Sequence, residues 1–308
     1  MTWVVELQRV SKSFGTVRAV DEVSLQVPAG RVFALLGPNG AGKTTTLRVL
    51  MGIYFPDAGE VRVFGGPPAA ARTRIGYLPE TRGLYRQARV QELLEYLAQL
   101  KGLDARTARQ RAVAWLERFD LLGWARRKVH ELSHGMQQKL QLAVTLIHEP
   151  PLVILDEPFQ GLDPVNVRLV EDIIRDLRAR GRTIVLSSHQ LHRVERLAEE
   201  VALIHRGRIV EQGALAALRR AYARGQVRVR LAPGHDLPDA TPGVLARRAV
   251  EPGVWLLDLA PAARPGDVLK ALLAQGLPLE GFEVVQPSLE DIFLQAVATQ
   301  QEAQHAVA

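Results

Sequence analysis

One glycine-rich segment holds the residues whose types and spacing most directly suggest chemistry. It follows an apolar run at residues 32–36, precedes a helix-like pattern, and comprises Gly37, Pro38, Asn39, Gly40, Ala41, Gly42, Lys43, Thr44 and Thr45. Glycines at this spacing let successive backbone N–H groups turn inward around a phosphate, while the lysine reaches the β- and γ-phosphates and the threonine hydroxyl can ligate Mg²⁺. The segment therefore predicts a P-loop (Walker A) that binds a nucleoside triphosphate.

A pair of carboxylates forms the second candidate group. Asp156 and Glu157 directly follow an apolar run at residues 152–155 that reads as a buried strand. We expect this strand to lie beside the strand that precedes the P-loop, so that Asp156 reaches Mg²⁺ and Glu157 polarises an attacking water. The P-loop alone does not separate kinases, GTPases and ATPases, which differ in what surrounds the phosphates.

The segment between these two groups carries a resemblance to a known family. Leu132 is followed by Ser133, His134, Gly135, Met136 and two glutamines, and then by a helical pattern. This segment resembles the signature motif of ABC-type ATPases, with His134 in place of the usual first glycine and Met136 in place of the usual glutamine. In that family the motif presents a serine hydroxyl and a helix N-terminus to ATP held by the opposite subunit. The resemblance implies that Ser133 and Gly135 bind nucleotide in trans, within a homodimer or heterodimer of ATP-binding subunits.

Three further segments agree with this family in type and order. Residues 161–164, Gly-Leu-Asp-Pro, resemble the loop that crosses the dimer interface. His189, after Ser187 and Ser188, resembles the switch histidine, which implies that it acts in catalysis with Glu157 and Lys43. Phe14 precedes Gly15 and fits the aromatic residue on which adenine stacks.

Glu80 lies where ABC ATPases carry a glutamine that senses Mg²⁺ and links the core to a helical insertion. The resemblance implies that Thr44, Glu80 and Asp156 meet the metal, and we expect Glu80 to keep the linking role. Candidates for the groove in which a membrane partner docks follow it directly, at Arg82, Leu84 and Tyr85.

The elements that must position these residues alternate between strand and helix. Alternating apolar residues predict strands at 4–10 and 23–27, and further strands are predicted at 60–64, 152–155 and 183–186. A long helical section is predicted from about Val90 to Arg118, and a helix from about Asn166 to Ala179. The pattern predicts an α/β fold with a parallel sheet and a helical insertion. With the resemblance, the fold class is a P-loop NTPase core of the ABC type over residues 1–220, with a helical subdomain at about 86–150.

Beyond Gly213 the pattern changes. We expect a helix near 214–223, strands at 226–231, 253–259 and 282–285, and a helix through Ala274 that Asp267 caps. Ser288 opens a capping-box-like sequence before a final helix, with a frayed tail from about Gln300. This predicts a small C-terminal α+β accessory domain over residues 225–308, for which regulation, dimer contact and added stability all remain open. Residues 287–294 resemble the ending of ATPase subunits of bacterial sodium-extrusion or multidrug exporters.

Composition sets outer limits on the function. The 308-residue chain has no cysteine, 47% hydrophobic residues and a net charge of +6, which fits a globular protein without disulfides. Its start lacks a signal-peptide pattern, and its apolar runs fall short of the ~20 residues that cross a bilayer. The excess basic residues are scattered without interleaved aromatic residues, which favours a solvated helical face over a nucleic-acid surface.

Together with the resemblance to ABC-type ATPases and to exporter subunits, these features predict the ATP-binding and ATP-hydrolysing subunit of an ABC exporter. It would bind ATP and Mg²⁺, dimerise, and lie in the cytoplasm against the cell membrane through separate transmembrane permease subunits, with no nucleic acid expected. One alternative is a soluble ABC-type ATPase acting on nucleic acid or ribosomes, although the chain has one cassette and no long coiled-coil insertion. Another is a P-loop kinase, against which Glu157 and the Ser133 segment argue. The transported substrate stays open.

Overall fold

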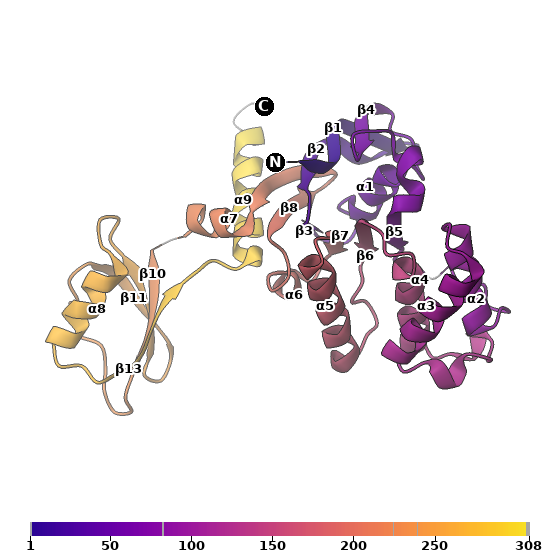
Figure 1. The fold of residues 1–308 in the computed structure, drawn as a ribbon. Coiled ribbons are helices and arrows are strands. Elements are labelled where there is room, and N and C mark those ends of the chain that lie inside the picture. The colour runs from indigo at the N-terminus through magenta and orange to yellow at the C-terminus, as the bar shows by residue number, and fades with distance from the viewer. Residues whose placement is uncertain (1, 82, 224, 239, 306–308) are drawn as a thin grey trace. The chain divides into compact units, whose positions relative to one another are not determined.

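The computed structural model describes residues 2–81, 83–223, 225–238 and 240–305 (Figure 1). The chain forms two compact units: unit 1 comprises residues 1–215 together with 296–308, and unit 2 comprises residues 216–295. Among the described residues, no helix is both long and apolar enough to cross a lipid bilayer.

A six-stranded sheet forms the centre of unit 1. Its strand order is β5 (Ile75–Leu78), β6 (Leu152–Asp156), β7 (Thr183–Ser188), β3 (Val32–Leu36), β8 (Glu200–His205) and β9 (Arg208–Ala214). All neighbouring pairs are parallel except β8 and β9. Strands β3, β6 and β7 are buried along their whole length, which is why they read as unbroken apolar runs. The carboxyl ends of these three strands therefore meet at one edge, where the P-loop begins.

The strand order corrects one expectation. Strand β6, which ends in Asp156, does not lie beside β3, because β7 is inserted between them. The prediction that β6 lies directly beside β3 was therefore wrong. Asp156 still lies at the P-loop end of the sheet, because it pairs with Ser187 on β7, and the next residue of β7, Ser188, pairs with Leu36 at the end of β3. Strand β7 thus adds its own polar side chains between the two motifs.

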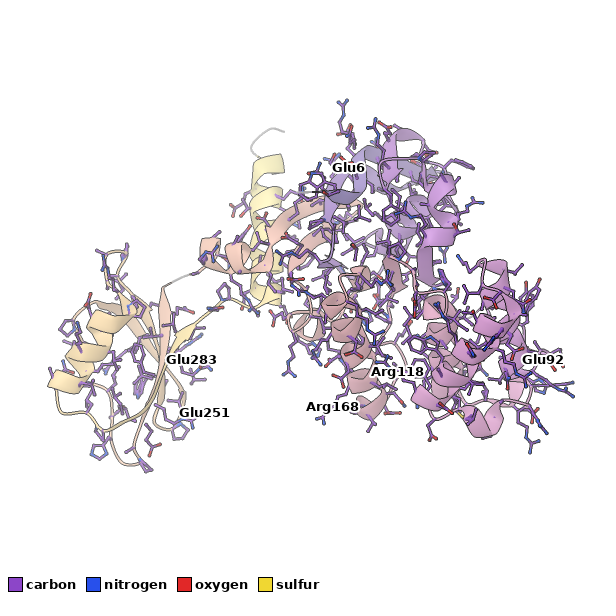
Figure 2. All side chains as sticks on the ribbon, in the orientation of Figure 1. Glu6, Glu92, Arg118, Arg168, Glu251 and Glu283 are labelled. Atoms are coloured by element: carbon purple, nitrogen blue, oxygen red, sulfur yellow. The ribbon has the colours of Figure 1, made fainter. Side chains whose placement is uncertain are left out.

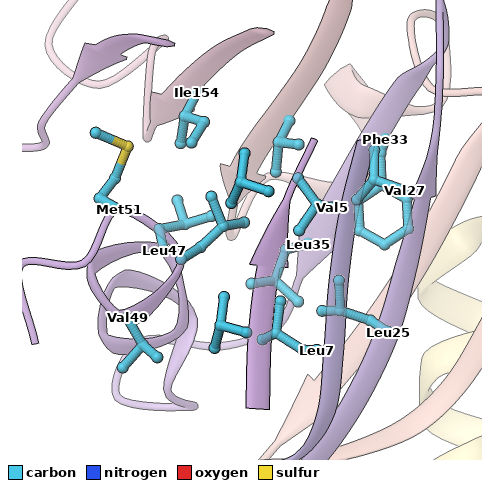
Figure 3. Close-up of a cluster of buried hydrophobic side chains, with 14 of the residues drawn as sticks. Val5, Leu7, Leu25, Val27, Phe33, Leu35, Leu47, Val49, Met51 and Ile154 are labelled. Carbon is cyan, nitrogen blue, oxygen red and sulfur yellow. The ribbon is translucent and has the colours of Figure 1, made fainter. Parts of the chain in front are cut away.

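A second, antiparallel sheet packs against the first through a shared apolar core. It contains β2 (Val17–Pro28), β1 (Trp3–Phe14) and β4 (Ala58–Val63), in that order. Figure 3 shows side chains of β1, β2, β3, β6 and helix α1 (Lys43–Leu50) in one buried cluster, including Val5, Leu25, Phe33, Leu47 and Ile154. Because both β3 and α1 are anchored in this core, the P-loop that joins them is fixed at both ends.

The helical insertion of unit 1 differs from the predicted single long section. It contains α2 (Val90–Leu100), α3 (Ala105–Arg118) and α4 (His134–Leu146), with short 3₁₀ segments at Leu122–Trp124 and Val129–Glu131. The helix breaks after Leu100 because Gly102 takes a left-handed conformation with φ 95°, and Asp104 caps α3 by accepting a hydrogen bond from the Thr107 N–H at 3.0 Å. Unit 1 also contains a 3₁₀ segment at Pro68–Arg74, α5 (Pro164–Ala179) and α6 (Leu191–Val194).

Unit 2 is a four-stranded antiparallel sheet with a helix on one face. The strand order is β11 (Val244–Glu251), β12 (Val254–Leu259), β10 (Gln226–Leu231) and β13 (Leu279–Val285), and β11 was not predicted. Helix α8 (Pro265–Ala274) buries Val268 and Leu272 against the sheet. The expected cap at Asp267 was wrong, since Arg264 is the N-cap and Asp267 lies in the first turn of the helix. Helix α7 (Leu215–Ala221) precedes the sheet in the chain.

The last helix, α9 (Leu289–His305), begins in unit 2, and its residues from Ala296 onward belong to unit 1. The predicted cap is confirmed: the Ser288 hydroxyl accepts from the Asp291 N–H at 3.1 Å, and the Asp291 carboxylate accepts from the Ser288 N–H at 3.0 Å. The expected fraying from Gln300 was wrong, since the helix continues to His305. Gln300 lines a polar pocket of unit 1 with residues of β2 and β9.

Candidate nucleotide-binding and hydrolysis site

The P-loop conformation depends on glycine at two close approaches. Gly42 has φ 107°, and a Cβ there would lie 2.4 Å from the Ala19 carbonyl oxygen. A Cβ on Gly37 would lie 2.1 Å from the carbonyl oxygen of Ile204 on β8. Any side chain at either position would therefore push the loop away from the strands that support it.

Lys43 crosses the P-loop with its side chain almost fully buried. Its ammonium group donates to the carbonyl oxygens of Gly37 at 2.8 Å and Pro38 at 3.1 Å. The same nitrogen lies 3.4 Å from Oε1 of Glu157. The loop lysine and the second carboxylate, 114 positions apart in the sequence, thus form a buried ion pair at one edge of the sheet.

Asp156 ends β6 and is fully buried beside two hydroxyl groups. Its Oδ1 accepts from Thr44 Oγ1 at 3.1 Å and from Ser187 Oγ at 2.6 Å. Burial raises the pKa of Asp156 above its usual value, and the hydrogen bonds from Ser187 and Thr44 oppose that shift. Its other oxygen, Oδ2, is buried and has no hydrogen-bond partner among the described residues. A buried carboxylate oxygen with spare capacity beside a threonine hydroxyl fits a hard divalent cation such as Mg²⁺.

Glu157 is held from two sides in a strained backbone conformation. His189 Nδ1 lies 3.0 Å from Oε2, while Lys43 approaches Oε1. The residue has φ 50°, a region that costs a non-glycine residue of the order of 1 kcal/mol or more and that clusters at functional sites. The Glu157 N–H donates to Ser187 Oγ at 3.1 Å, which helps to fix this conformation.

A pocket of about 240 Å³ opens over these residues. Its lining brings together the predicted residues Asn39, Gly40, Gly42, Lys43, Thr44, Thr45, Glu80, Glu157 and His189, and adds Ala19 and Gln160. Gly37, Pro38, Ala41 and Asp156 support the lining without forming it. Sequence reasoning missed Ala19, Gln160 and the bridging role of Ser187. A serine at the end of an otherwise apolar strand was the available signal for Ser187.

The remaining predicted residues lie elsewhere on unit 1. Phe14 is 44% exposed and contacts Tyr54 edge to face, with ring centroids 5.2 Å apart. Ser133 and Gly135 lie at the N-terminus of α4, where Ser133 Oγ accepts from the Met136 N–H at 3.3 Å. Within the described residues of this single chain, none of these three lines the pocket.

Two of the candidate docking residues are described. Leu84 is half-buried and Tyr85 is exposed, and both follow the Glu80 segment without regular secondary structure. Arg82 lies outside the described residues. Glu80 itself is exposed and lines the pocket.

Comparisons with known protein families match both parts of the chain. The family described as "ABC transporter" matches residues 20–160, and the family described as "ATP-binding protein DrrA1-3-like, C-terminal domain" matches residues 213–297. The uncharacterized ABC transporter ATP-binding protein YhaQ of Bacillus subtilis (strain 168) is 38% identical over 96% of this chain and 98% of its own length.

Two other relatives have names that mention export or drug resistance. The daunorubicin resistance ATP-binding protein DrrA3 of Streptomyces coeruleorubidus is 34% identical over 94% of each chain. The Nod factor export ATP-binding protein I of Paraburkholderia xenovorans (strain LB400) is 41% identical over 70% of this chain and 72% of its own. Among solved structures, an ATP binding subunit of an ABC transporter is 31% identical with a TM-score of 0.67, covering 71% of this chain and 93% of its own.

Proposed function

Because this chain belongs to the ATP-binding proteins of ABC transporters, whose members bind and hydrolyse ATP, we propose that it hydrolyses ATP to drive export through separate membrane subunits. The observation that carries the proposal is the convergence of Lys43, Glu157 and His189 on one pocket above the P-loop. A lysine for phosphate charge and a buried carboxylate for water are the groups that hydrolysis of a triphosphate needs.

Glu157 acts on the attacking water, as general base or as the group that positions it. The ion pair with Lys43 and the contact with His189 hold both carboxylate oxygens, so that the side chain keeps one orientation in the pocket. His189 therefore aligns Glu157, and Lys43 stabilises the charge that develops on the phosphates.

Mg²⁺ would be held by Thr44 and Asp156. Glu80 lines the same pocket as Thr44 and would also meet the ion. When bound, the ion supplies positive charge that neutralises the phosphate oxygens. In this chain, Ser187 keeps the Asp156 carboxylate in place, and burial keeps competing water away from it. Glu80 links this site to the chain that leads into the helical insertion.

The proposed dimer is supported by residues that lie outside the pocket. Ser133 is exposed at the N-terminus of α4, and a helix N-terminus suits a phosphate. Since Ser133 and Gly135 do not line the pocket of their own chain, a second subunit would present them there, in a homodimer or a heterodimer. Phe14, exposed at the end of β1, would stack on the adenine ring.

The direction of transport is supported by the relatives. Two of them are named for Nod factor export and for daunorubicin resistance, and the second also covers unit 2 of this chain. Tyr85 and Leu84 would contact the permease, which would place the protein on the cytoplasmic face of the membrane. We propose that unit 1 acts as the ATPase domain and unit 2 as an accessory domain, with bounds of residues 1–215 plus 296–308 and residues 216–295 in place of the expected 1–220 and 225–308.

The experiment that tests the ATPase proposal replaces Glu157 with glutamine and measures phosphate release and oligomeric state with MgATP. Loss of a general base should reduce hydrolysis by about 10²- to 10⁴-fold, while nucleotide binding persists and an ATP-dependent dimer accumulates. Glu117→Gln, an exposed carboxylate on α3, is the matched control and should retain the wild-type rate. Unchanged hydrolysis in Glu157→Gln with no ATP-induced dimer would overturn the proposed mechanism.

A second substitution tests the linking role of Glu80. Glu80→Ala should lower both the basal ATPase rate and its stimulation by the reconstituted permease, because the side chain lies in the pocket and precedes the docking segment. If both rates equal those of the wild type, Glu80 has neither role.

A further inference from the structure

Unit 1 contains a further pocket, of about 280 Å³, at the opposite end of its central sheet from the P-loop. Arg182 directly precedes β7 and Glu149 lies three positions before β6, so both mark the amino ends of these strands. The pocket is lined by Arg111, Ala114, Trp115, Arg118, Leu146, Glu149, Ile173, Asp176, Leu177, Arg180 and Arg182. None of these residues belongs to the nucleotide site described above.

Two helix faces with the same spacing form the walls. Helix α3 contributes residues 111, 114, 115 and 118, and α5 with the residue after its C-terminal end contributes residues 173, 176, 177 and 180. Both sets follow the i, i+3, i+4, i+7 pattern, which places each set on one side of its helix. An ion pair between Arg118 and Asp176 at 2.5 Å joins the two walls.

The interior of this pocket is apolar. Among its lining residues, Trp115 and Leu177 are half-buried, and Leu146 and Ile173 are almost fully buried. The Trp115 ring stacks on Phe119, which fixes its orientation. An apolar group that entered here would lose contact with water on several sides.

The rim of the pocket carries excess positive charge. Four arginines line it against two carboxylates, and Arg111 and Arg118 are already paired with Glu149 and Asp176. Arg180 and Arg182 form no ion pair with any residue that the structure describes. These two guanidinium groups are therefore available to an incoming anion.

We propose that this pocket is a binding site for an amphipathic organic anion, a carboxylate attached to an unbranched or aromatic apolar body. The body would enter between α3 and α5 against Trp115 and Leu177, and the carboxylate would be bound by Arg180 and Arg182, whose planar forks suit carboxylate oxygens. The occupant would contact both the helical insertion and the sheet layer of unit 1. This site is independent of the proposed ATPase function and needs no nucleotide.

Calorimetric titration of the full chain with sodium hexanoate, octanoate and decanoate tests the proposal. Each additional buried methylene should tighten binding about fourfold, until the pocket is filled and the gain stops. 1-Octanol, which has the same apolar body without the charge, should bind about tenfold or more weakly than octanoate. Equal affinity for octanoate and 1-octanol, or no saturable binding of any of the carboxylates, would overturn the proposal.

Three variants locate the binding. Arg182→Gln should weaken octanoate binding about five- to tenfold, and Ala114→Phe, at an exposed position of α3, should fill the pocket and abolish binding without disturbing the core. Arg168→Gln is the control, since Arg168 lies on α5 outside the lining (Figure 2). If Arg168→Gln weakens binding as much as Arg182→Gln, or if Ala114→Phe binds octanoate like the wild type, the site is not this pocket.

Discussion

Ser187 bridges the two acidic residues of the nucleotide site, and replacing it with alanine should have an unusually large effect for a serine. Its hydroxyl donates to the Asp156 carboxylate at 2.6 Å and accepts from the Glu157 N–H at 3.1 Å. All three residues are buried, so water cannot replace the lost hydroxyl without entering the core.

The magnitude follows from the two hydrogen bonds. A hydrogen bond to a charged group contributes about 1.5–3 kcal/mol and one between neutral groups about 0.5–1.5 kcal/mol, so Ser187→Ala should lower the free energy of unfolding by about 2–4.5 kcal/mol. The neighbouring Ser188→Ala is a matched control, because Ser188 is as buried but accepts from one neutral donor, the Gln190 N–H at 3.0 Å. It should cost about 0.5–1.5 kcal/mol.

Urea denaturation of both variants and the wild type measures the difference directly. The hydroxyl of Ser187 also opposes the rise in the pKa of Asp156, so its removal should raise the Mg²⁺ concentration needed for half-maximal ATP hydrolysis. If Ser187→Ala and Ser188→Ala lose the same free energy and require the same Mg²⁺ concentration, the bridging role assigned to Ser187 is wrong.

Two further predictions concern the P-loop and acid stability. Gly42→Ala should abolish ATP binding in calorimetry, because its Cβ would lie 2.4 Å from the Ala19 carbonyl oxygen. Gly102→Ala, outside the nucleotide pocket and with no atom within 4 Å of its Cβ, should cost about 1–2 kcal/mol of stability through its φ of 95° alone and should still bind ATP. Burial and the charge of Lys101 lower the pKa of His148 to about 4 from 6.5. The unfolded chain therefore takes up a proton below pH 6.5 that the folded chain refuses until about pH 4, and stability falls as the pH drops through this window. In denaturation experiments, the wild type should lose about 2 kcal/mol more unfolding free energy between pH 7 and pH 5 than His148→Gln does. If both proteins lose the same amount, groups other than His148 cause the pH dependence.

The elements that were predicted correctly are determined by residues that lie close together in the sequence. Strands β3, β6 and β7 are buried on both faces, which produces the apolar runs that predicted them. The cap at Ser288 is also local, because its partner Asp291 lies three positions further on. Gly102 and Asp104 were equally local signals for the break between α2 and α3, and the long apolar periodicity obscured them.

The remaining features depend on contacts between distant segments. The position of β7 between β3 and β6 is set by the packing of the whole sheet, and no short pattern specifies strand order. Strand β11 is mostly exposed at the edge of its sheet and lacks an apolar run. The role of Ser187 arises only when β6 and β7 align so that it faces Asp156. The trans role of Ser133 and the metal role of Glu80 stay predictions.

The path of α9 makes unit 2 an inserted domain with two connections to its host. The chain leaves unit 1 near residue 215 and rejoins it at residue 296. A truncation after Ala223 would therefore also remove host residues, including Gln300 from the pocket that it lines beside β2 and β9. If such a truncation lost activity, the result would not distinguish damage to unit 1 from the loss of unit 2. A deletion that removes unit 2 alone would excise residues 216–295 and join residues 215 and 296 with a short flexible linker.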